Sequence, residues 1–595
     1  MGKGSFMQQL IRWREEGRIS ALDARFGSFL AERSGNETLG LLGAVTSHLR
    51  SQGHVCLDPR LPPEDLPGLE LESAWAAIQT LDSRWLGRST DHWHPLVLDE
   101  GRLYLGRLHR AECRIAERIL AWSRMPNRPA PDREDMERLF PEPDPGSLQQ
   151  ALAAVVAMLR PCTLITGGPG TGKTTTVLRI LALHLRQRPE LAIRLLAPTG
   201  KAAARLTESL QQGRSRLRLP GFDPARIPDR VSTVHRFLGL GRGRPRYHRH
   251  RPAPVDLVVL DEASMIDLET MQRLLDALPK HAGLILLGDP DQLASVEAGS
   301  VLADLVAPAR DAAFTRATRE TIAAAGLPVE HLEDGDALDD GLVRLTHSHR
   351  FPSERGIGKL AAAVRHGDAE WSCLQEIARS NPEIELLEWR GDKLPSDAFD
   401  GFLEALDSAR HADVEAALEA LADARVLCAL RRGPAGVEIL NATLAERLGR
   451  ADDRHAHGRP ILVTRNAAAL GVYNGDMGVL WESAERSNHG RPRLHACFLS
   501  ESGNLRRLPL PELPEHEPAY AITVHKSQGS EYDRILLVLP PEPHPLVTRE
   551  LIYTALTRAR TSVRILATPA SWNEGVTRRT QRASGLADRL RRPTS

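Results

Sequence analysis

The residues best suited to chemistry lie in one glycine-rich segment, Gly167 to Thr174, with the sequence GGPGTGKT. The apolar run LIT precedes it and the helical run TTVLRILALHLRQ follows it, which is the strand–loop–helix context of a P-loop. Its glycines allow backbone N–H groups to turn towards a phosphate, and the helix N-terminus adds partial positive charge. We expect Lys173 to neutralise the β- and γ-phosphates of ATP and Thr174 to bind Mg²⁺. The other nucleotide contacts expected here are Gly167, Gly168, Pro169, Gly170, Thr171, Gly172 and Thr175.

An acidic pair, Asp261-Glu262, ends the apolar run VDLVVL. Carboxylates at the carboxyl end of a strand suit a Walker B site, where Asp261 would hold Mg²⁺ and Glu262 would polarise the attacking water as a general base. A helix N-cap is the alternative explanation of such a pair. Because the acidic pair lies downstream of a P-loop, in a strand-rich region, the catalytic interpretation is favoured.

Three further residues suit the control of hydrolysis by domain movement. Gln292, in GDPDQL, follows a third apolar run and could sense the γ-phosphate, although a turn rich in Asp and Pro is the alternative. Arg350, in LTHSHRF, and Arg558, in YTALTRAR, could reach the γ-phosphate from the other side, because arginine is always charged and bidentate. For each of these arginines the alternative is a surface salt bridge.

Composition and charge describe an ordinary multidomain protein. The 595 residues suffice for three or four domains, with 42% hydrophobic and 26% charged residues. The 77 basic residues balance 77 acidic ones, which does not fit a protein that coats DNA nonspecifically but leaves room for a local basic groove. The six cysteines are scattered without a CxxC pair, which predicts reduced thiols and neither a zinc site nor disulfides. With no apolar signal core and no membrane span in the sequence, we expect a cytoplasmic protein.

The chain divides by pattern into an N-terminal region and two α/β lobes. Residues 1–123 carry helical periodicity and several Trp residues, and the Pro- and charge-rich stretch 124–147 predicts a linker. Apolar runs that end in turn residues predict a parallel sheet in each lobe, 148–342 and 343–595. The runs are CTLITGG, IRLLAPTG, VDLVVLDE and GLILLGD, then ARVLCAL, RPILVTRN, RILLVLP and SVRILAT. Short alternating strands at about 470–518 predict a small antiparallel barrel inserted into the second lobe.

Eight motifs follow one another over roughly residues 148–570: GGPGTGKTTT, APTGKAA, STVHRFLG, VVLDEASMID, GDPDQL, HRF, AITVHKSQGSEYD and YTALTRAR. In this order they resemble superfamily 1 DNA helicases, and in detail the RecD family, the alpha subunits of exodeoxyribonuclease V (the RecBCD complex). The resemblance implies two RecA-like P-loop motor lobes, a helical N-terminal domain and an SH3-like β-barrel in the second lobe. It implies an ATP- and Mg²⁺-dependent helicase that moves 5′ to 3′ along single-stranded DNA, in double-strand break repair, homologous recombination and degradation of linear DNA.

The resemblance also implies roles for single residues. Gln149 stands where the family reads adenine, and Glu531 where it contacts the nucleotide sugar and phosphates. Gln292 would couple the γ-phosphate to the DNA groove, and Arg350 and Arg558 would be arginine fingers. The residues in motifs that face single-stranded DNA, or that bridge DNA to ATP, are Thr199, Lys201, Thr233, His235, Thr523, His525 and Gln528.

Base stacking and partners complete the expectations. Phe237 and Tyr473 are candidates for stacking on bases, with a place in the core as the alternative for both. The chain departs from the family at three positions. An aromatic residue is usual where this chain has Leu148 and His349, and Phe or Leu is usual where it has Tyr473. The family implies DNA ends, RecB and RecC as partners, with RecC docking through residues 1–123. No D…ExK-type carboxylate cluster stands in a nuclease context, so the nuclease would belong to RecB.

Three alternatives stay open. A stand-alone RecD-like helicase would work without RecB and RecC, although such relatives usually carry a longer N-terminal region with helix-hairpin-helix repeats. A non-enzymatic subunit would have a dead P-loop, which the intact Lys173, Asp261 and Arg558 disfavour. The N-terminal region could also be a self-contained helical cap on the motor rather than a docking surface.

Overall fold

The computed structural model describes residues 5–88, 93–141, 144–241, 243–350, 356–389, 394–395, 397–449, 456–467, 469–486, 492–499 and 504–592. Its N-terminal domain has helices on a four-stranded sheet with the order β1-β4-β3-β2. Gly27 and Gly40 let two of these helices touch, because a Cβ on either glycine would lie within 2.7 Å of the other helix. The elements are α1 (Ser5–Glu15), α2 (Ala21–Ser34), α3 (Glu37–Ser51), β1 (Cys56–Leu57), α4 (Leu71–Gln79), β2 (Leu86–Gly87), β3 (Leu96–Asp99), β4 (Arg102–Leu105) and α5 (Gly106–Ser123).

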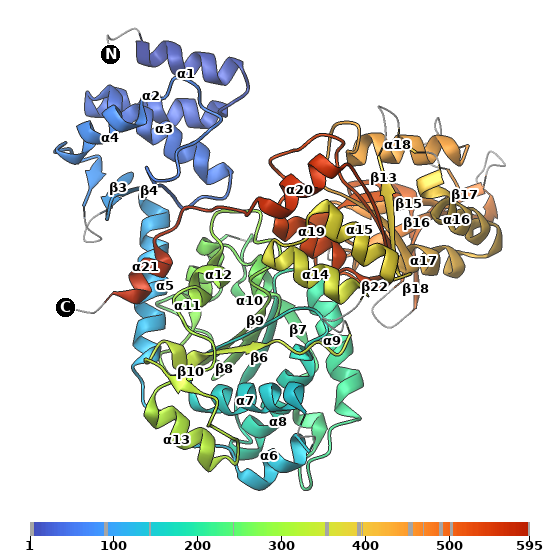
Figure 1. The fold of residues 1–595 in the computed structure, drawn as a ribbon, viewed down its shortest axis with the longest axis horizontal. Coiled ribbons are helices and arrows are strands. Elements are labelled where there is room, and N and C mark those ends of the chain that lie inside the picture. Colours follow the sequence, from blue (N-terminus) through green and yellow to red (C-terminus); the bar gives the residue numbers. More distant parts are fainter. Residues whose placement is uncertain are drawn as a thin grey trace.

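The first lobe contains a six-stranded parallel sheet with the order β12-β5-β9-β8-β6-β7. The four apolar runs predicted as strands form its centre, and a helical layer packs on each face (Figure 1). The strands are β5 (Cys162–Gly167), β6 (Ile193–Ala197), β7 (Val231–Thr233), β8 (Leu257–Leu260), β9 (Gly283–Gly288) and β12 (Leu342–Leu345). The helices are α7 (Pro145–Leu159), α8 (Lys173–Gln187), α9 (Gly200–Arg214), α10 (Val234–Leu238), α11 (Leu268–Ala277) and α12 (Val301–Val306).

The second lobe has a five-stranded parallel sheet with the order β13-β22-β21-β14-β20. Three of the four predicted runs are confirmed as its strands, which supports two RecA-like lobes. The strands are β13 (Ile384–Glu388), β14 (Ala424–Cys428), β20 (Ala521–Thr523), β21 (Tyr532–Val538) and β22 (Ala559–Ala567). The helices are α14 (Gly356–His366), α15 (Trp371–Ser380), α16 (Asp400–Ala412), α17 (Val414–Asp423), α18 (Val437–Arg447), α19 (Arg549–Leu556) and α20 (Pro569–Thr577).

The fourth run, RPILVTRN, belongs elsewhere. It forms β15, which pairs antiparallel on both sides within a separate five-stranded sheet of order β18-β17-β16-β15-β19. This sheet is the expected antiparallel insertion, and it begins before position 470 because β15 is part of it. Its strands are β15 (Arg459–Val463), β16 (Met477–Arg486), β17 (Pro492–Leu499), β18 (Leu505–Pro509) and β19 (His516–Pro518).

Two expected boundaries need revision. The strand β12 pairs with β5 in register Leu342 to Leu164, so the sheet of the first lobe continues beyond position 342. The expected linker 124–147 contains the helix α6 (Arg133–Leu139) and the start of α7, and Met136 and Leu139 are buried in the core of the first lobe. Between α12 and β12 lie the strands β10 (Ala313–Phe314) and β11 (Glu333–Asp334) and the helix α13 (Arg316–Ala324).

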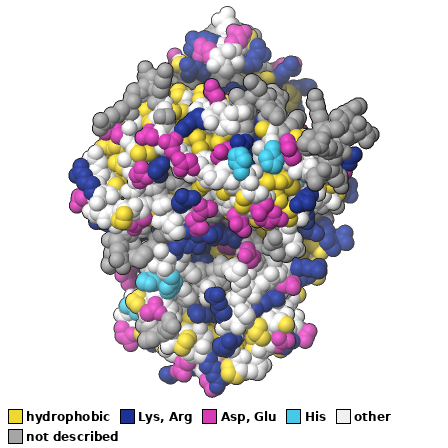
Figure 2. All heavy atoms as spheres, turned by 90° about the vertical axis from the view of Figure 1, so that its right-hand side faces the viewer, with side chains coloured by type: hydrophobic (Ala, Val, Ile, Leu, Met, Phe, Trp, Pro, Cys, Tyr) yellow, Lys and Arg dark blue, Asp and Glu magenta, His cyan; other side chains and the backbone are white. Residues whose placement is uncertain are grey.

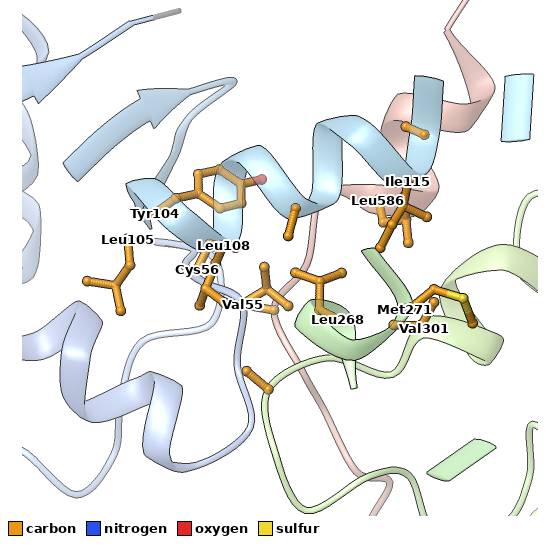
Figure 3. Close-up of a cluster of buried hydrophobic side chains, with 14 of the residues drawn as sticks. Val55, Cys56, Tyr104, Leu105, Leu108, Ile115, Leu268, Met271, Val301 and Leu586 are labelled. Carbon is orange, nitrogen blue, oxygen red and sulfur yellow. The ribbon is translucent and has the colours of Figure 1, made fainter. Parts of the chain in front are cut away.

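The C-terminal segment leaves the second lobe after α20 and ends at α21 (Leu586–Arg591), beside α5 (Figure 1). Its Leu586 lies next to Ile115 of α5 in a core that also contains Leu268 and Val301 of the first lobe (Figure 3). The N-terminal domain, the first lobe and the chain end therefore share one hydrophobic core. Among the described residues, every helix is too short or too polar to cross a membrane.

Candidate active site

The glycine-rich segment forms a loop between β5 and α8, as its pattern predicts. Gly170 and Gly172 have φ angles of +79° and +80°, a left-handed conformation that favours glycine. Space is also limiting, since a Cβ on Gly170 would lie 2.5 Å from the Cβ of Arg350. The ammonium group of Lys173 donates to the carbonyl oxygens of Gly167 at 2.5 Å and Gly168 at 3.0 Å, so it lies across the loop.

This loop borders a cavity of about 600 Å³ between the two lobes. The cavity brings together most of the predicted nucleotide and catalytic residues, namely Pro169, Gly170, Thr171, Gly172, Lys173, Thr174, Thr175, Asp261, Glu262, Gln292, Arg350, Glu531 and Arg558. Gly167 and Gly168 contribute the carbonyl groups beneath it and do not line it. Residues from both lobes therefore surround one space of ligand size.

The predicted adenine contact, Gln149, and its neighbour Gln150 have different surroundings. The Gln149 side chain faces away from the cavity, where its Oε1 accepts from the backbone N–H of Thr346 at 2.9 Å and its Nε2 donates to Thr346 Oγ1 at 2.7 Å. Its neighbour Gln150 lines the cavity instead, donating to the carbonyl of Thr171 at 3.3 Å and accepting from Arg179 at 3.0 Å. Successive residues of a helix point about 100° apart, so a shift of one position changes the face.

The acidic pair follows β8 in an unusual conformation. Glu262 has a φ of 51°, a left-handed conformation that is uncommon for a residue with a side chain. Burial raises the pKa of Asp261, the charge of Glu262 raises it further, and Lys173 opposes both. Since Asp261 and Thr174 line the same cavity, their oxygens fit the hard-cation chemistry of Mg²⁺. Among the described residues no group of three His, Cys, Asp or Glu side chains could hold a metal ion.

The loop after β9 meets the second lobe at several hydrogen bonds. Arg558 donates from Nη2 to Oε1 of Gln292 at 2.8 Å, and both side chains are buried. The backbone N–H of Leu293 donates to Thr554 Oγ1 at 2.9 Å, and Gln528 donates to the carbonyl of Leu293, also at 2.9 Å. The predicted sensor and the predicted arginine are thus in direct contact across the lobes.

Glu531 is enclosed by arginines from both lobes. It pairs with Arg205 of α9, with Arg350 at 2.7 Å and with Arg560 at 3.5 Å. Burial alone would raise the pKa of Glu531, but Arg205 and then Arg350 outweigh it and hold the pKa at about 2. The carboxylate therefore stays charged and orders the guanidinium groups at the cavity edge.

Sequence reasoning did not identify Tyr553, Asp289 or Arg205 as site residues. The Tyr553 hydroxyl of α19 donates to Asp289 Oδ2 of the first lobe at 3.0 Å and lies beside the P-loop, since a Cβ on Gly168 would be 2.9 Å from it. Tyr553 and Asp289 stand within recognised motifs, so their place in YTALTRAR and GDPDQL was the available signal.

Three of the predicted DNA contacts are threonines with a common structural role. Thr199, Thr233 and Thr523 each end a strand or its following loop and cap the next helix by accepting a hydrogen bond from a backbone N–H, at 3.2, 3.2 and 3.3 Å. Thr233 and Thr523 are the last residues of the edge strands β7 and β20 of their sheets, and both begin the same local sequence, Thr-Val-His. Exposed groups at helix N-termini suit contact with phosphates.

The remaining predicted DNA contacts differ in exposure. His235 is exposed, Lys201 and His525 are half-buried, and burial lowers the pKa of His525. Tyr473 of the insertion lies against α9 of the first lobe, because a Cβ on Gly200 would be 3.4 Å from its ring. Phe237 packs against the core and the ring of Tyr247, with 5.4 Å between ring centroids, so its contacts are those of the core alternative.

Surface charge is mixed around the lobes. On the face that Figure 2 shows, acidic and basic side chains are interspersed, and Lys and Arg gather in a band across its middle. This distribution agrees with the balanced composition and with a local, rather than global, positive surface.

Comparison with known proteins places these features in a family. Family models match in three places: the N-terminal domain of RecBCD enzyme subunit RecD over residues 15–104, an AAA domain over 150–298 and the UvrD-like helicase C-terminal domain over 518–566. The RecBCD enzyme subunit RecD of Mycobacterium tuberculosis is 40% identical over 97% of this chain and 96% of its own length. The ATP-dependent RecD2 DNA helicase of Deinococcus radiodurans is 31% identical over 85% of this chain and 62% of its own length. A solved Pif1 helicase from Candida albicans covers 70% of this chain and 93% of its own, with a TM-score of 0.35 and 14% identity.

Proposed function

The chain belongs to the RecD family of RecBCD subunits, and on that premise we propose that it is an ATP-dependent helicase subunit that moves along single-stranded DNA. The observation that carries the proposal is the shared cavity, in which the P-loop and Asp261 of one lobe face Arg558 and Glu531 of the other. An ATP molecule in that cavity would contact both lobes at once. Its hydrolysis would then change how the lobes are held together.

The residues of the chain supply the chemistry as follows. The P-loop N–H groups and Lys173 hold the phosphates, and Glu262 orients and deprotonates the attacking water. Arg558 and Arg350 stabilise the charge that builds on the transferred phosphoryl group. Mg²⁺, held by Thr174 and Asp261 together with phosphate oxygens, would neutralise charge on the β- and γ-phosphates.

Movement along DNA would follow from closure of the cavity. The loop after β9 connects Gln292, at the nucleotide, with Leu293, which is bonded to Gln528 in a motif expected to face DNA. Closure that shifts one lobe relative to the other therefore shifts the DNA-facing threonines of the two lobes, Thr233 and Thr523, relative to each other. We propose 5′ to 3′ movement, with the antiparallel insertion acting as an SH3-like barrel beside the path of the strand.

The partners proposed are RecB, RecC and DNA ends, in repair and recombination in the bacterial cytosol. RecC would dock on the N-terminal domain, residues 1–123, and the nuclease would lie on RecB. The expected limits, a linker at 124–147, a first lobe from 148 and a second lobe from 343, enter this proposal with the revision that α6, the start of α7 and β12 belong to the first lobe. The alternative of a stand-alone helicase is less supported, because the chain is 40% identical to the RecD subunit and 31% identical to the RecD2 helicase, and the RecD N-terminal domain model matches residues 15–104.

The proposal is tested by measuring ATP hydrolysis of the full chain with and without single-stranded DNA. A motor requires stimulation by DNA, and equal rates in both conditions would contradict the proposal. Translocation on strands blocked at either end tests direction, and movement from 3′ to 5′ would overturn that part alone. Co-purification from native cells with two large subunits, or without them, decides between the complex and the stand-alone helicase.

A further inference from the structure

The side chain of Arg582, in the C-terminal segment, binds the loop 292–299 of the first lobe, which we call the gripped loop. Its Nη1 donates to the carbonyls of Glu297 at 3.0 Å and Gly299 at 2.9 Å, and its Nη2 donates to the carbonyl of Ser295 at 2.6 Å. Three backbone acceptors of one loop thus converge on a single guanidinium. The fixed, planar fork of arginine suits this task, whereas a lysine ammonium cannot match it.

The gripped loop starts at Gln292, the residue predicted to sense the γ-phosphate. It begins with Gln292, which contacts Arg558, and Leu293, which is bonded to Thr554 and Gln528. Three residues after Gln292 the loop reaches Ser295 and the first contact with Arg582. One loop of the first lobe is therefore held by the second lobe at its start and by the C-terminal segment at its end.

Both attachments lead to the same helix, α19. Its C-terminal half carries Thr554 and precedes Arg558, so it holds the start of the loop. Its N-terminal end carries Glu550, whose carboxylate accepts from the backbone N–H of Thr580 at 3.0 Å, two residues before Arg582. A movement of α19 relative to the first lobe would therefore act on both ends of this loop.

On its other side Arg582 faces the N-terminal domain. Gly53, with a φ of +92°, leaves room for the guanidinium, because a Cβ there would lie 2.7 Å from Arg582 Cζ. The next residue of the segment, Ala583, donates to His54 Nδ1 at 3.0 Å and accepts from the N–H of Val55 at 2.8 Å. Beyond it Leu586 is buried beside α5 (Figure 3), so the segment is firmly docked.

The charge of Arg582 also acts on a residue of the expected DNA path. Burial lowers the pKa of His525, and the charge of Arg582 lowers it further. His525 lies in the short helix that Thr523 caps. The exposed tip of the gripped loop is Val296, which is 75% exposed between the contacts of Arg582.

We infer that Arg582 is a positioning residue of the motor, which holds the loop 292–299 so that lobe closure at the nucleotide is transmitted to the DNA-facing surface and to the N-terminal domain. The inference rests on the proposed motor function. A purely structural role, in which the C-terminal segment only holds the domains together, predicts a different result. If Arg582 only holds the domains together, its loss lowers the stability of the fold and impairs ATP binding and hydrolysis together. If Arg582 couples the two sites, its loss lowers the stimulation of hydrolysis by DNA and leaves ATP binding unchanged.

The test compares Arg582→Ala and Arg582→Lys with the parent full chain. The readouts are the KM for ATP, the ratio of hydrolysis rates with and without single-stranded DNA, and the thermal unfolding midpoint. We expect Arg582→Ala to keep the KM and to lose roughly three- to thirtyfold of the stimulation ratio, the range seen for residues that carry coupling between sites. Arg582→Lys should lie between this variant and the parent.

The matched control is Arg591→Ala, which removes another arginine–carbonyl bond of the same segment, to Ala307 at 2.7 Å, away from the loop. We expect it to behave as the parent. A folded Arg582→Ala with the parent ratio would overturn the inference, as would an equal loss in Arg591→Ala. If the alanine variant unfolds, the lysine variant decides, and a parent ratio there contradicts the inference. A parent chain without DNA stimulation would instead contradict the proposed function, and the inference with it.

Discussion

Arg558 of the second lobe donates a hydrogen bond from Nη2 to Oε1 of Gln292 in the first lobe, with 2.8 Å between the atoms. The exposed fractions of the two residues are 2% and 7%, so the bond lies out of water. Burial lowers the pKa of Arg558, and Glu262 opposes this. The arginine expected to act on the γ-phosphate is thus hydrogen-bonded to the residue expected to sense that phosphate. A change in the position of either side chain would therefore affect the other.

A double-mutant cycle on this pair is expected to be non-additive. Arg558→Ala should lower DNA-stimulated kcat by about 10³-fold, the lower end of the range for arginine fingers. Gln292→Ala should cost less, because Arg558 keeps its bonds to Thr554 and Ser530. The double variant should fall short of the sum by about 0.5–3 kcal/mol.

The control for this cycle is Arg564→Ala, which removes an arginine of the same lobe that pairs with Glu385 at the surface. Steady-state ATP hydrolysis with saturating single-stranded DNA is the measurement. Additive losses would show that the contact between Arg558 and Gln292 has no part in turnover.

Replacing the P-loop lysine should abolish turnover without unfolding the chain. Lys173→Gln removes the charge that faces the phosphates and keeps a polar N–H donor near the carbonyls of Gly167 and Gly168, which lie beneath the cavity. We expect DNA-stimulated hydrolysis to become undetectable and the circular dichroism and unfolding midpoint to stay at parent values. The exposed Lys280→Gln serves as a control, and hydrolysis at the parent rate in Lys173→Gln would disprove the P-loop assignment.

Much of the motor could be predicted because its signals are local. Runs such as VDLVVL and GLILLG are buried on both faces, so a parallel sheet was readable from continuous apolar residues. The same signal misassigned RPILVTRN, since β15 is equally apolar but pairs antiparallel. Continuous burial identifies a strand, but its partner depends on contacts far away in the sequence.

Other features had no local signal. The strand β13 is half polar in IELLE, and β7 is three residues long, so neither stands out by pattern. Arg582 is one of many arginines, and its role depends on Ser295, Glu297 and Gly299, almost 300 residues away. Such residues become visible only when the topology brings the two segments together.

The adjacent glutamines allow a test of which of them contacts the nucleotide. Gln150 lines the cavity beside Gly172, whereas Gln149 is bonded to Thr346 outside it. We expect Gln150→Ala to raise the KM for ATP about three- to tenfold, as the loss of one polar contact would. Gln149→Ala, which differs only in position, should leave the KM within about twofold of the parent, as expected for a contact outside the site. A larger rise of the KM in Gln149→Ala than in Gln150→Ala would identify Gln149 as the nucleotide contact.

Glu531 predicts a pH dependence of stability with a defined sign. Its pKa is about 2 in the folded chain, below the ordinary 4.5, because Arg205 and Arg350 favour the charged form more strongly than burial disfavours it. The charged carboxylate thus stabilises the fold above about pH 4.5, and this contribution is lost as the pH falls towards 2. A shift of this size corresponds to about 3 kcal/mol at neutral pH.

Urea unfolding of Glu531→Gln and of the parent, at several values from pH 7 down to pH 3, measures this contribution. We expect the variant to be less stable by about 2–3 kcal/mol at pH 7 and the gap to narrow below pH 4.5. The exposed carboxylate variant Glu385→Gln should differ from the parent by less than about 1 kcal/mol, because its pair with Arg564 is at the surface. If the difference in the free energy of unfolding between the parent and Glu531→Gln stays constant with pH, the contacts of Glu531 with the arginines do not stabilise the fold through its charge.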